Sequence, residues 1–171
     1  MVTADLKSSV GAMAVAFAVA SLTACASAPH IAMRPPEGTG GTMRPYQVHG
    51  VWYRPAYQPH YDAVGLATWY GDAYHNKTTA DGEIFDMNRP SAAHTTLPLP
   101  SIIEVTNLDN GRRVKLRLND RGPFVSGRLL DVSREAAKEL GFYGKGTARV
   151  RVRYVGPAPA LSSLETARLD R

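Results

Sequence analysis

Three short segments of the sequence hold polar residues that no strand or helix pattern accounts for. They read TADGEIFD at 79–86, AAHTTLP at 92–98 and NDRGPF at 119–124. Between them they supply Glu83, His94 and Asp120, two carboxylates and one histidine, which are the usual groups for proton transfer. Asp120 ends a predicted strand before a Gly-Pro turn, so it projects from rigid scaffold into a loop rim, where sites tend to form. These residues indicate general acid–base chemistry.

Each of these residues also has a purely structural interpretation. An Asp before Arg-Gly-Pro is often a turn former whose carboxylate binds its own backbone. His94, which precedes a Thr, is typical of a hydrogen-bonded structural histidine, and Glu83 can be a surface carboxylate. Arg121, beside Asp120, either orients a substrate or keeps the carboxylate ionised. The spacing alone leaves both interpretations open.

Short strands with turn signals surround the three segments. Apolar and polar residues alternate at 102–108 and 113–119, which predicts two strands joined in a hairpin across the Asp-Asn-Gly at 109–111. A shorter strand is predicted at 65–70 and a last one at 147–155. Alternation places the apolar side chains of each strand on one face of the sheet.

One short helix is predicted at 134–140, because Ser133 is a good N-cap and Gly141 is a typical helix terminator. Several short strands with a single short helix place the chain in the mainly β class, as a small closed barrel or a sandwich.

The last predicted strand carries a row of outward arginines, Arg149, Arg151 and Arg153. One interpretation of the row is a binding surface for an anionic polymer along the strand. The simpler interpretation is a solvated strand face that discourages pairing with another sheet edge.

Composition and charge narrow the function classes. The chain has 171 residues, 44% of them hydrophobic, and a formal net charge of +5 at pH 7, which suits one globular domain with additional segments. This mild positive field fits an anionic polymer or a membrane surface. No Lys/Arg run with interleaved aromatics is present, so nucleic acid is not an expected partner. No cofactor is expected, and no metal site either, because the histidines lie far apart without an acidic cluster.

The single cysteine, Cys25, follows a secretion signal. Eleven apolar residues at 10–20 match a signal core and are too few to span a bilayer. The sequence LTAC at 22–25 resembles a bacterial lipobox, which implies a signal peptide at 1–24 and a lipid on Cys25. An ordinary secretory signal that contains a cysteine is the alternative. Lipidation predicts an envelope protein facing the periplasm, with the outer membrane favoured because Ala and Ser, rather than Asp, follow the cysteine.

Residues 25–63 are predicted to form a lipidated tether that ends in an aromatic arm. Pro, Gly and Thr dominate its first part, as in a flexible linker. Over 46–61, aromatic residues recur, and this arm either packs on the domain surface or contacts sugar rings. Residues 156–171 are predicted to be a flexible tail.

The motifs together resemble the rare lipoprotein A (RlpA) family. Beside the three polar segments they are GLATWYG at 65–71, VTNLDNGR at 105–112 and GRLLDVSREAAKELG at 127–141. The resemblance implies a six-stranded double-psi β-barrel with a short helix over 64–155, after a signal peptide and a flexible linker. It also implies an envelope lipoprotein that acts as a lytic transglycosylase on peptidoglycan glycan strands, preferring strands without stem peptides.

The resemblance assigns roles to individual residues. Asp120 is the expected catalytic acid, with Glu83 and His94 in the same groove. Contacts to the substrate are expected from Trp69, Tyr70, Asn119 and Arg121. The two aromatic residues among these offer flat apolar faces to sugar rings.

A lytic transglycosylase needs fewer groups than a hydrolase, because the muramic acid's own primary hydroxyl attacks in place of water. Asp120 is expected to protonate the departing glycosidic oxygen and then to accept the proton of that hydroxyl. Its pKa must be raised for the first step, by partial burial or by Glu83 nearby, whereas Arg121 would lower it.

Two other function classes stay open. A non-catalytic glycan-binding or expansin-like wall-loosening barrel would keep the same groove, and an interaction module could dock cell-division proteins. Longer members of the family carry a C-terminal SPOR module that binds peptide-free glycan. Only some 16 residues follow the barrel here, so the resemblance leaves targeting to the septum open.

Overall fold

The computed structural model describes residues 41–159, which belong to one compact unit, Arg34–Arg171. The predicted signal peptide, Cys25 and most of the predicted tail lie outside the described residues. Within the described range, no helix is long and apolar enough to cross a membrane.

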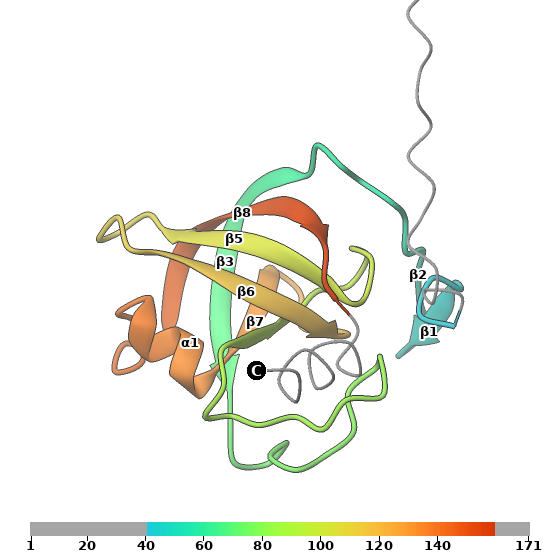
Figure 1. Ribbon diagram of the computed structural model, residues 1–171, viewed down its shortest axis with the longest axis horizontal. Coiled ribbons are helices and arrows are strands. Elements are labelled where there is room, and N and C mark those ends of the chain that lie inside the picture. The colour runs from blue at the N-terminus through green and yellow to red at the C-terminus, as the bar shows by residue number, and fades with distance from the viewer. Residues whose placement is uncertain (1–40, 160–171) are drawn as a thin grey trace, which may run out of the picture. The chain divides into compact units, whose positions relative to one another are not determined.

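Six strands close into a barrel (Figure 1). In hydrogen-bonding order they are β3 (Asp62–Tyr70), β7 (Arg128–Ser133), β4 (Ser91–Ala93), β6 (Arg113–Asp120), β5 (Ser101–Asn107) and β8 (Thr147–Pro157), which pairs again with β3. The β3–β7 and β4–β6 pairs are parallel, and the other pairs are antiparallel. The predicted mainly β, six-stranded barrel is confirmed, and its mixed order fits the double-psi type.

Alternate residues of the long strands fill the barrel interior. Those with no exposed surface include Ile103, Val105, Leu116, Leu118, Val150 and Val152. This is the alternation that the sequence predicts for 102–108, 113–119 and 147–155. Because the sheet closes on itself, each barrel strand has a partner on both sides, and the hydrophobic side chains face a common core.

The sequence pattern does not predict two of the six strands. β4 reads Ser-Ala-Ala, which is too short for an alternation to show. β7 reads RLLDVS and is buried on both faces over its last four residues, so it lacks the period of two that marks a half-exposed strand. Both strands are essential to closure, because they lie between β3 and β6 in the barrel.

The helix α1 (Arg134–Glu139) forms where the sequence predicts it. The hydroxyl of Ser133 accepts a hydrogen bond from the backbone N–H of Ala136 at 3.2 Å, and a second one from the N–H of Ser91 at 3.1 Å. Gly141, with φ of 76°, then ends the helix in the left-handed region. The N-cap therefore connects the helix to strand β4 as well.

The aromatic arm forms a small hairpin of β1 (Tyr46–Val48) and β2 (Val51–Tyr53). His49 and Gly50 make its turn with φ of 48° and 81°, the backbone of a tight type I′ hairpin.

The inner face of this hairpin packs on the barrel domain. The rings of Tyr46 and Tyr53 stack at 5.3 Å, and both meet the ring of Phe124 edge-on. The Tyr46 hydroxyl donates to the carbonyl of Thr95 at 2.7 Å. Of the two interpretations of the arm, packing on the domain holds for these tyrosines, whereas Trp52 is 60% exposed.

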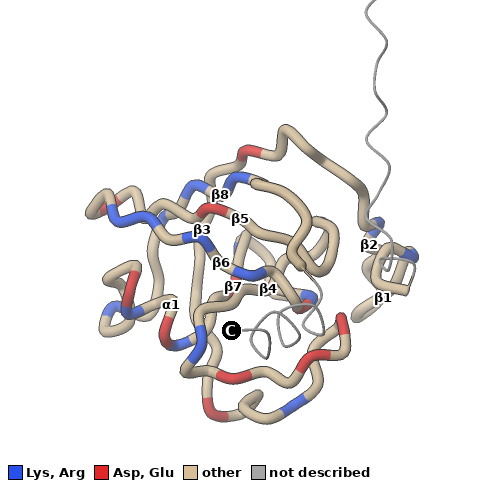
Figure 2. The backbone as a smooth tube through the Cα atoms, viewed as in Figure 1, with Lys and Arg blue, Asp and Glu red and all other residues tan. Residues whose placement is uncertain are grey.

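Two of the three outward arginines of β8 are paired with acidic residues of neighbouring strands. Arg151 donates to Asp62 on β3 at 2.7 Å, and Arg153 pairs with Glu104 on β5. Positive and negative residues accordingly alternate across β3, β5 and β8 (Figure 2). Exposed pairs contribute only about 0–1 kcal/mol each, so the row is a solvated face, as the simpler interpretation has it. It does not protect a sheet edge, because β8 pairs with β3 and with β5 in the closed barrel.

Candidate active site

An open cavity of about 470 Å³ lies where β3, β6 and β7 meet the loop at 121–125. Four of its lining residues form one row across neighbouring strands: Thr68 of β3 pairs with Asp131 of β7, which pairs with Ala93 of β4, which pairs with Asp120 of β6. Paired residues of neighbouring strands present their side chains on the same face. The small Ala93 between them leaves room, so both carboxyl groups face one cavity.

Asp120 ends β6 and is held by the backbone. Its Oδ1 accepts hydrogen bonds from the N–H of Arg121 at 2.8 Å and of Ala80 at 2.9 Å. Burial raises the pKa of the Asp120 carboxyl, although these two bonds and the Arg121 charge lower it in part. The sequence left two causes open for a raised pKa of Asp120, partial burial and the neighbouring Glu83. The cause is burial. The group has the properties of a proton donor.

Asp131 is a second carboxyl group in the cavity, and sequence reasoning missed it. Its Oδ1 accepts a hydrogen bond from the Thr68 hydroxyl at 2.5 Å, and its Oδ2 accepts one from Arg128 at 3.1 Å. Burial raises its pKa, while Thr68 and Arg128 lower it in part. The signal that could have found it is a charged residue inside the apolar run LLDV, since a lone carboxylate there must have a partner.

The predicted aromatic residues lie in the same cavity. The ring of Trp69 packs against that of Tyr143 at 4.9 Å, and its Nε1 donates to the carbonyl of Tyr143 at 3.2 Å. Tyr70 stacks on Phe85 at 4.4 Å, and burial, together with the charges of Asp120 and Asp131, strongly raises its pKa. Tyr70 is therefore a neutral phenol beside both carboxyl groups.

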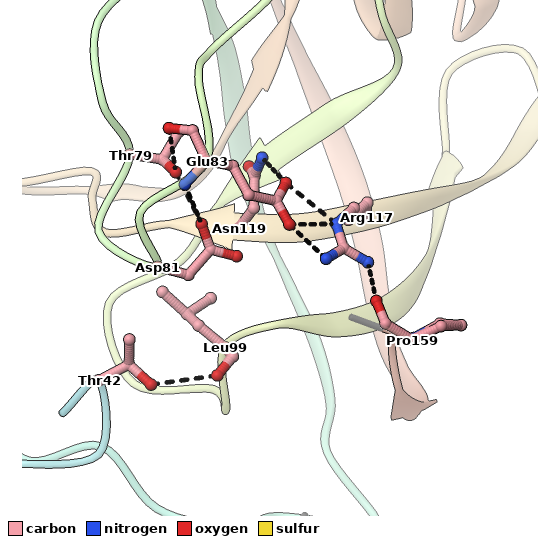
Figure 3. Close-up of polar contacts among 8 residues, drawn as sticks. All are labelled: Thr42, Thr79, Asp81, Glu83, Leu99, Arg117, Asn119 and Pro159. Atoms are coloured by element: carbon pink, nitrogen blue, oxygen red, sulfur yellow. Dashed lines mark hydrogen bonds and ion pairs between the residues drawn. The ribbon is translucent and has the colours of Figure 1, made fainter. Parts of the chain in front are cut away.

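Glu83 and Asn119 line a different, smaller pocket of about 80 Å³. Figure 3 shows the polar contacts around these two residues. Arg117 forms an ion pair with Glu83, and the amide of Asn119 donates to its Oε2 at 2.9 Å. Burial favours the neutral form of Glu83, but the hydrogen bonds from Arg117 and Asn119 outweigh it and lower the pKa. Since successive residues of a strand point to opposite faces, Asn119 faces Glu83 while Asp120 faces the large cavity.

The loop at 79–83 connects the two pockets. Asp81 Oδ1 accepts hydrogen bonds from the Thr79 hydroxyl at 2.7 Å and from the N–H of Glu83 at 3.2 Å (Figure 3). The N–H of Asp81 donates to the carbonyl of Asn119 at 3.3 Å. The loop is thus fixed to the end of β6 through Asp81 and through Ala80, whose N–H binds Asp120.

His94 is buried, with 3% of its surface exposed, and it does not line the cavity. Its Nδ1 accepts hydrogen bonds from the N–H of Thr96 at 3.2 Å and of Leu97 at 3.1 Å. The proton of the neutral ring therefore lies on Nε2, 2.9 Å from the Tyr61 hydroxyl. Burial, with a smaller effect of Arg121, lowers its pKa to about 4. This position suits a residue that shapes the loop at 94–97.

Arg121 lines the cavity, but its guanidinium binds protein carbonyls. Nη1 donates to the carbonyls of Leu97 at 2.6 Å and of His94 at 3.1 Å, and Nη2 donates to that of Thr42 at 2.7 Å. Its guanidinium also lies 5.9 Å from the centre of the Tyr46 ring. These contacts hold three segments together beside Asp120.

The structure thus brings Trp69, Tyr70, Asp120 and Arg121 to one cavity. It places Glu83 and Asn119 in the smaller pocket and buries His94 outside both. Within residues 41–159, no three His, Cys, Asp or Glu side chains are close enough together to hold a metal ion.

A closed, mixed six-stranded barrel whose cavity combines aromatic rings with two carboxyl groups defines a double-psi β-barrel protein with a candidate acid–base site. The family model described as lytic transglycolase matches residues 62–152, more than half of the chain, and the chain belongs to this family. The resemblance to the rare lipoprotein A family is confirmed by curated relatives.

Two of these relatives are endolytic peptidoglycan transglycosylases RlpA. The protein of Campylobacter jejuni is 46% identical over 70% of this chain and 44% of its own length. That of Pseudomonas aeruginosa strain UCBPP-PA14 is 52% identical over 66% of this chain and 33% of its own length. The chain therefore spans less than half the length of either relative. Among solved structures, the Streptomyces papain inhibitor is 20% identical, with a TM-score of 0.49, over 58% of this chain and 99% of its own.

Proposed function

We propose that this protein is a lytic transglycosylase that cleaves the β-1,4 bond between N-acetylmuramic acid and N-acetylglucosamine in peptidoglycan and leaves anhydro-muramic ends. The observation that carries the proposal is Asp120, a half-buried carboxyl group of raised pKa at the wall of an open, aromatic-lined cavity. The membership of the family and the names of the relatives support the same reaction.

Asp120 performs both proton transfers in this proposal. Its raised pKa favours the protonated form, which donates to the departing glycosidic oxygen. The carboxylate that results is stabilised by the N–H groups of Ala80 and Arg121, and it then accepts the proton of the muramic acid's primary hydroxyl as that oxygen attacks the anomeric carbon. Since both backbone donors bind Oδ1, we assign the exchange of protons to Oδ2.

The aromatic residues bind the sugar rings. Trp69 and Tyr70 lie next to each other on β3 and both line the cavity, where flat apolar faces suit the C–H faces of pyranose rings. Asp131, on the other side of Ala93, supplies a second carboxyl group that can stabilise positive charge at the anomeric carbon.

The preference for strands without stem peptides and the envelope location belong to the same proposal. Lipidation of Cys25 would anchor the protein in the outer membrane, facing the periplasm. A lipid-anchored enzyme meets its polymer within the reach of its tether, which the predicted linker ahead of the β1–β2 hairpin would provide.

The test is digestion of purified, peptide-free glycan strands, followed by mass spectrometry of the products. The proposal expects anhydro-muramic ends from the wild type and not from Asp120→Asn. Reducing ends without the anhydro form would indicate a hydrolase. Binding of glycan without any cleavage would favour the non-catalytic, wall-loosening alternative.

A further inference from the structure

We infer that Arg128 recognises the free lactyl carboxylate of muramic acid, and so selects glycan strands from which the stem peptide has been removed. The inference rests on the proposed function, since it concerns the same cavity. In this inference, Arg128 distinguishes glycan with a free lactyl carboxylate from glycan that carries a stem peptide.

Arg121 and Arg128 are the two arginines that line the cavity. Arg121 is occupied, because both of its terminal nitrogens donate to backbone carbonyls of the protein. A ligand could bind it only by breaking the contacts that hold three segments beside Asp120. Arg128 is therefore the cation of the cavity that is available for an anionic ligand.

Arg128 begins β7, and its side chain is 27% exposed where it lines the cavity. A guanidinium has five N–H donors. Nη2 donates to Asp131 at 3.1 Å, and Nη1 makes no hydrogen bond within residues 41–159, whereas Nε is buried. The side chain is thus fixed in direction by Asp131 but keeps donors beyond that contact.

The substrate has one group that such a site would recognise. Each muramic acid carries a lactyl ether whose carboxylate is free in a peptide-free strand and becomes a neutral amide when a stem peptide is attached. A planar guanidinium pairs with a carboxylate through two parallel hydrogen bonds, which a neutral amide cannot reproduce. The charge that distinguishes the two forms is the charge that Arg128 complements.

The position of Arg128 also fits the reaction. The lactyl group and the anomeric carbon belong to the same pyranose ring, and Arg128 contacts Asp131, which shares the cavity with Asp120. A muramic acid held by Arg128 through its carboxylate would therefore place its reacting carbon near the carboxyl groups. Binding of the lactyl carboxylate then contributes to the orientation of the ring as well as to affinity.

The alternative is that Arg128 only compensates the charge of Asp131. Both roles require the ion pair between Arg128 and Asp131, so the ion pair does not distinguish them. They differ in whether glycan binding depends on the charge of the lactyl group. A purely structural Arg128 predicts equal binding of glycan with free and with blocked carboxylates. A recognition role predicts a difference that disappears when Arg128 is replaced.

The experiment measures binding in full-length Asp120→Asn protein, so that cleavage does not interfere. The probes are peptide-free glycan and the same glycan with its lactyl carboxyls converted to methylamides. With Arg128 present, blocking is expected to weaken binding about 10–100-fold, the range for a charge-assisted pair. Arg128→Met should bind both probes with equal, weak affinity, and Arg128→Lys should keep part of the difference. Arg151→Met, a matched change on the outer face of β8, should keep all of it.

Equal binding of both probes by the protein with Arg128, or a difference that persists in Arg128→Met, would overturn the inference. If Arg128→Met does not unfold cooperatively, Arg128→Gln, which can still donate to Asp131, replaces it in the comparison. Release of anhydro-muramic ends by the wild type is scored separately. Cleavage without discrimination between the probes would contradict the role of Arg128 and support the proposed function. Discrimination without cleavage would support the role of Arg128 and contradict the proposed function.

Discussion

At the scale of single residues, the cavity holds two carboxyl groups whose surroundings differ. Asp120 is bound by two backbone N–H groups, and Asp131 by a hydroxyl and a guanidinium. Backbone donors stay in place when the proton leaves, so Asp120 can change its charge without moving its neighbours. Asp131 is tied to the side chains of Thr68 and Arg128, which suits a constant charge.

Asp120→Asn is expected to lower kcat/KM on peptide-free glycan by at least about 10²–10⁴-fold, because an amide cannot donate the proton. Asp131→Asn should reduce it less, since that carboxyl group supports charge without exchanging a proton. The measurement is the rate of release of anhydro-muramic ends by both variants under one set of conditions. An equal or larger loss in Asp131→Asn would move the role of the acid to Asp131.

The raised pKa of Asp120 also predicts a pH-dependent stability. Between its ordinary value of 3.8 and its higher native value, the native state binds more protons than the unfolded state. The free energy of unfolding of the wild type therefore falls as pH rises through this window. The side chain of Asp120→Asn does not ionise, so this variant does not lose unfolding free energy in the same window. It should therefore be more stable relative to the wild type at pH 7 than below pH 3.8, where the gain should vanish. Urea unfolding across this pH range checks the sign, and a constant difference would contradict it.

Glu83 should show the opposite pH dependence. Its pKa is lowered from 4.5 in the folded state, so the ionised form stabilises the fold above pH 4.5 and this stabilisation is lost as pH falls through the native pKa. Glu83→Gln is expected to cost about 1.5–3 kcal/mol of unfolding free energy at neutral pH, the range for hydrogen bonds to charged groups. Unfolding curves at neutral and acidic pH provide the measurement.

Glu83→Gln should also reduce activity, but through Asp120. The loop at 79–83 would lose its anchor on Arg117, and with it the position of the Ala80 N–H that binds Asp120. A shift of the activity pH profile together with a lower kcat is the expected signature. An unchanged pH profile with a loss as large as that of Asp120→Asn would instead indicate direct proton transfer by Glu83.

At the scale of elements, the loop at 121–125 depends on segments outside the barrel strands. The β1–β2 hairpin packs Tyr46 and Tyr53 on Phe124, and Arg121 binds the carbonyl of Thr42 before the hairpin. Because Phe124 and Arg121 line the cavity, the hairpin contributes to the site without belonging to the barrel.

Removal of the hairpin should leave the barrel folded but weaken glycan binding at the site. Residues 62–159 contain every barrel strand, so this fragment is expected to unfold cooperatively, though at a lower temperature than residues 41–159. Its glycan binding should be weaker, since the loop at 121–125 loses its aromatic support. Circular dichroism melts and glycan binding of both fragments give the comparison. A molten 62–159 fragment would show that the arm is part of the core, and the predicted boundary of 64–155 would then be wrong.

At the scale of the whole molecule, the proposed anchor determines where the barrel acts. If Cys25 carries lipid, Cys25→Ala should move the protein from the membrane fraction to the soluble periplasm, because the acyl chains provide the attachment. Fractionation with antibody detection measures the distribution. An unchanged distribution, or a mature protein that still begins at Met1, would contradict the lipobox prediction.

The sequence by itself determined the features that depend on neighbouring residues. Alternation of apolar and polar residues predicted β5, β6 and β8, and the Ser133 cap predicted α1. The Gly-Pro turn after β6 indicated that Asp120 lies at a strand end. The likeness of the motifs to rare lipoprotein A then identified the family. These signals are local, since a period of two or a cap is complete within a few residues.

Only the tertiary structure decided which polar side chains share a cavity. β7 is buried on both faces, so the charge within LLDV showed only that Asp131 needs a partner. Closure of the barrel brought it into one row with Asp120 through β4. The same closure turned Glu83 toward Arg117 and buried His94 against Tyr61. The physical reason is that burial and the choice of partner arise from segments far apart in the chain, and these two factors set the pKa and the role of each group.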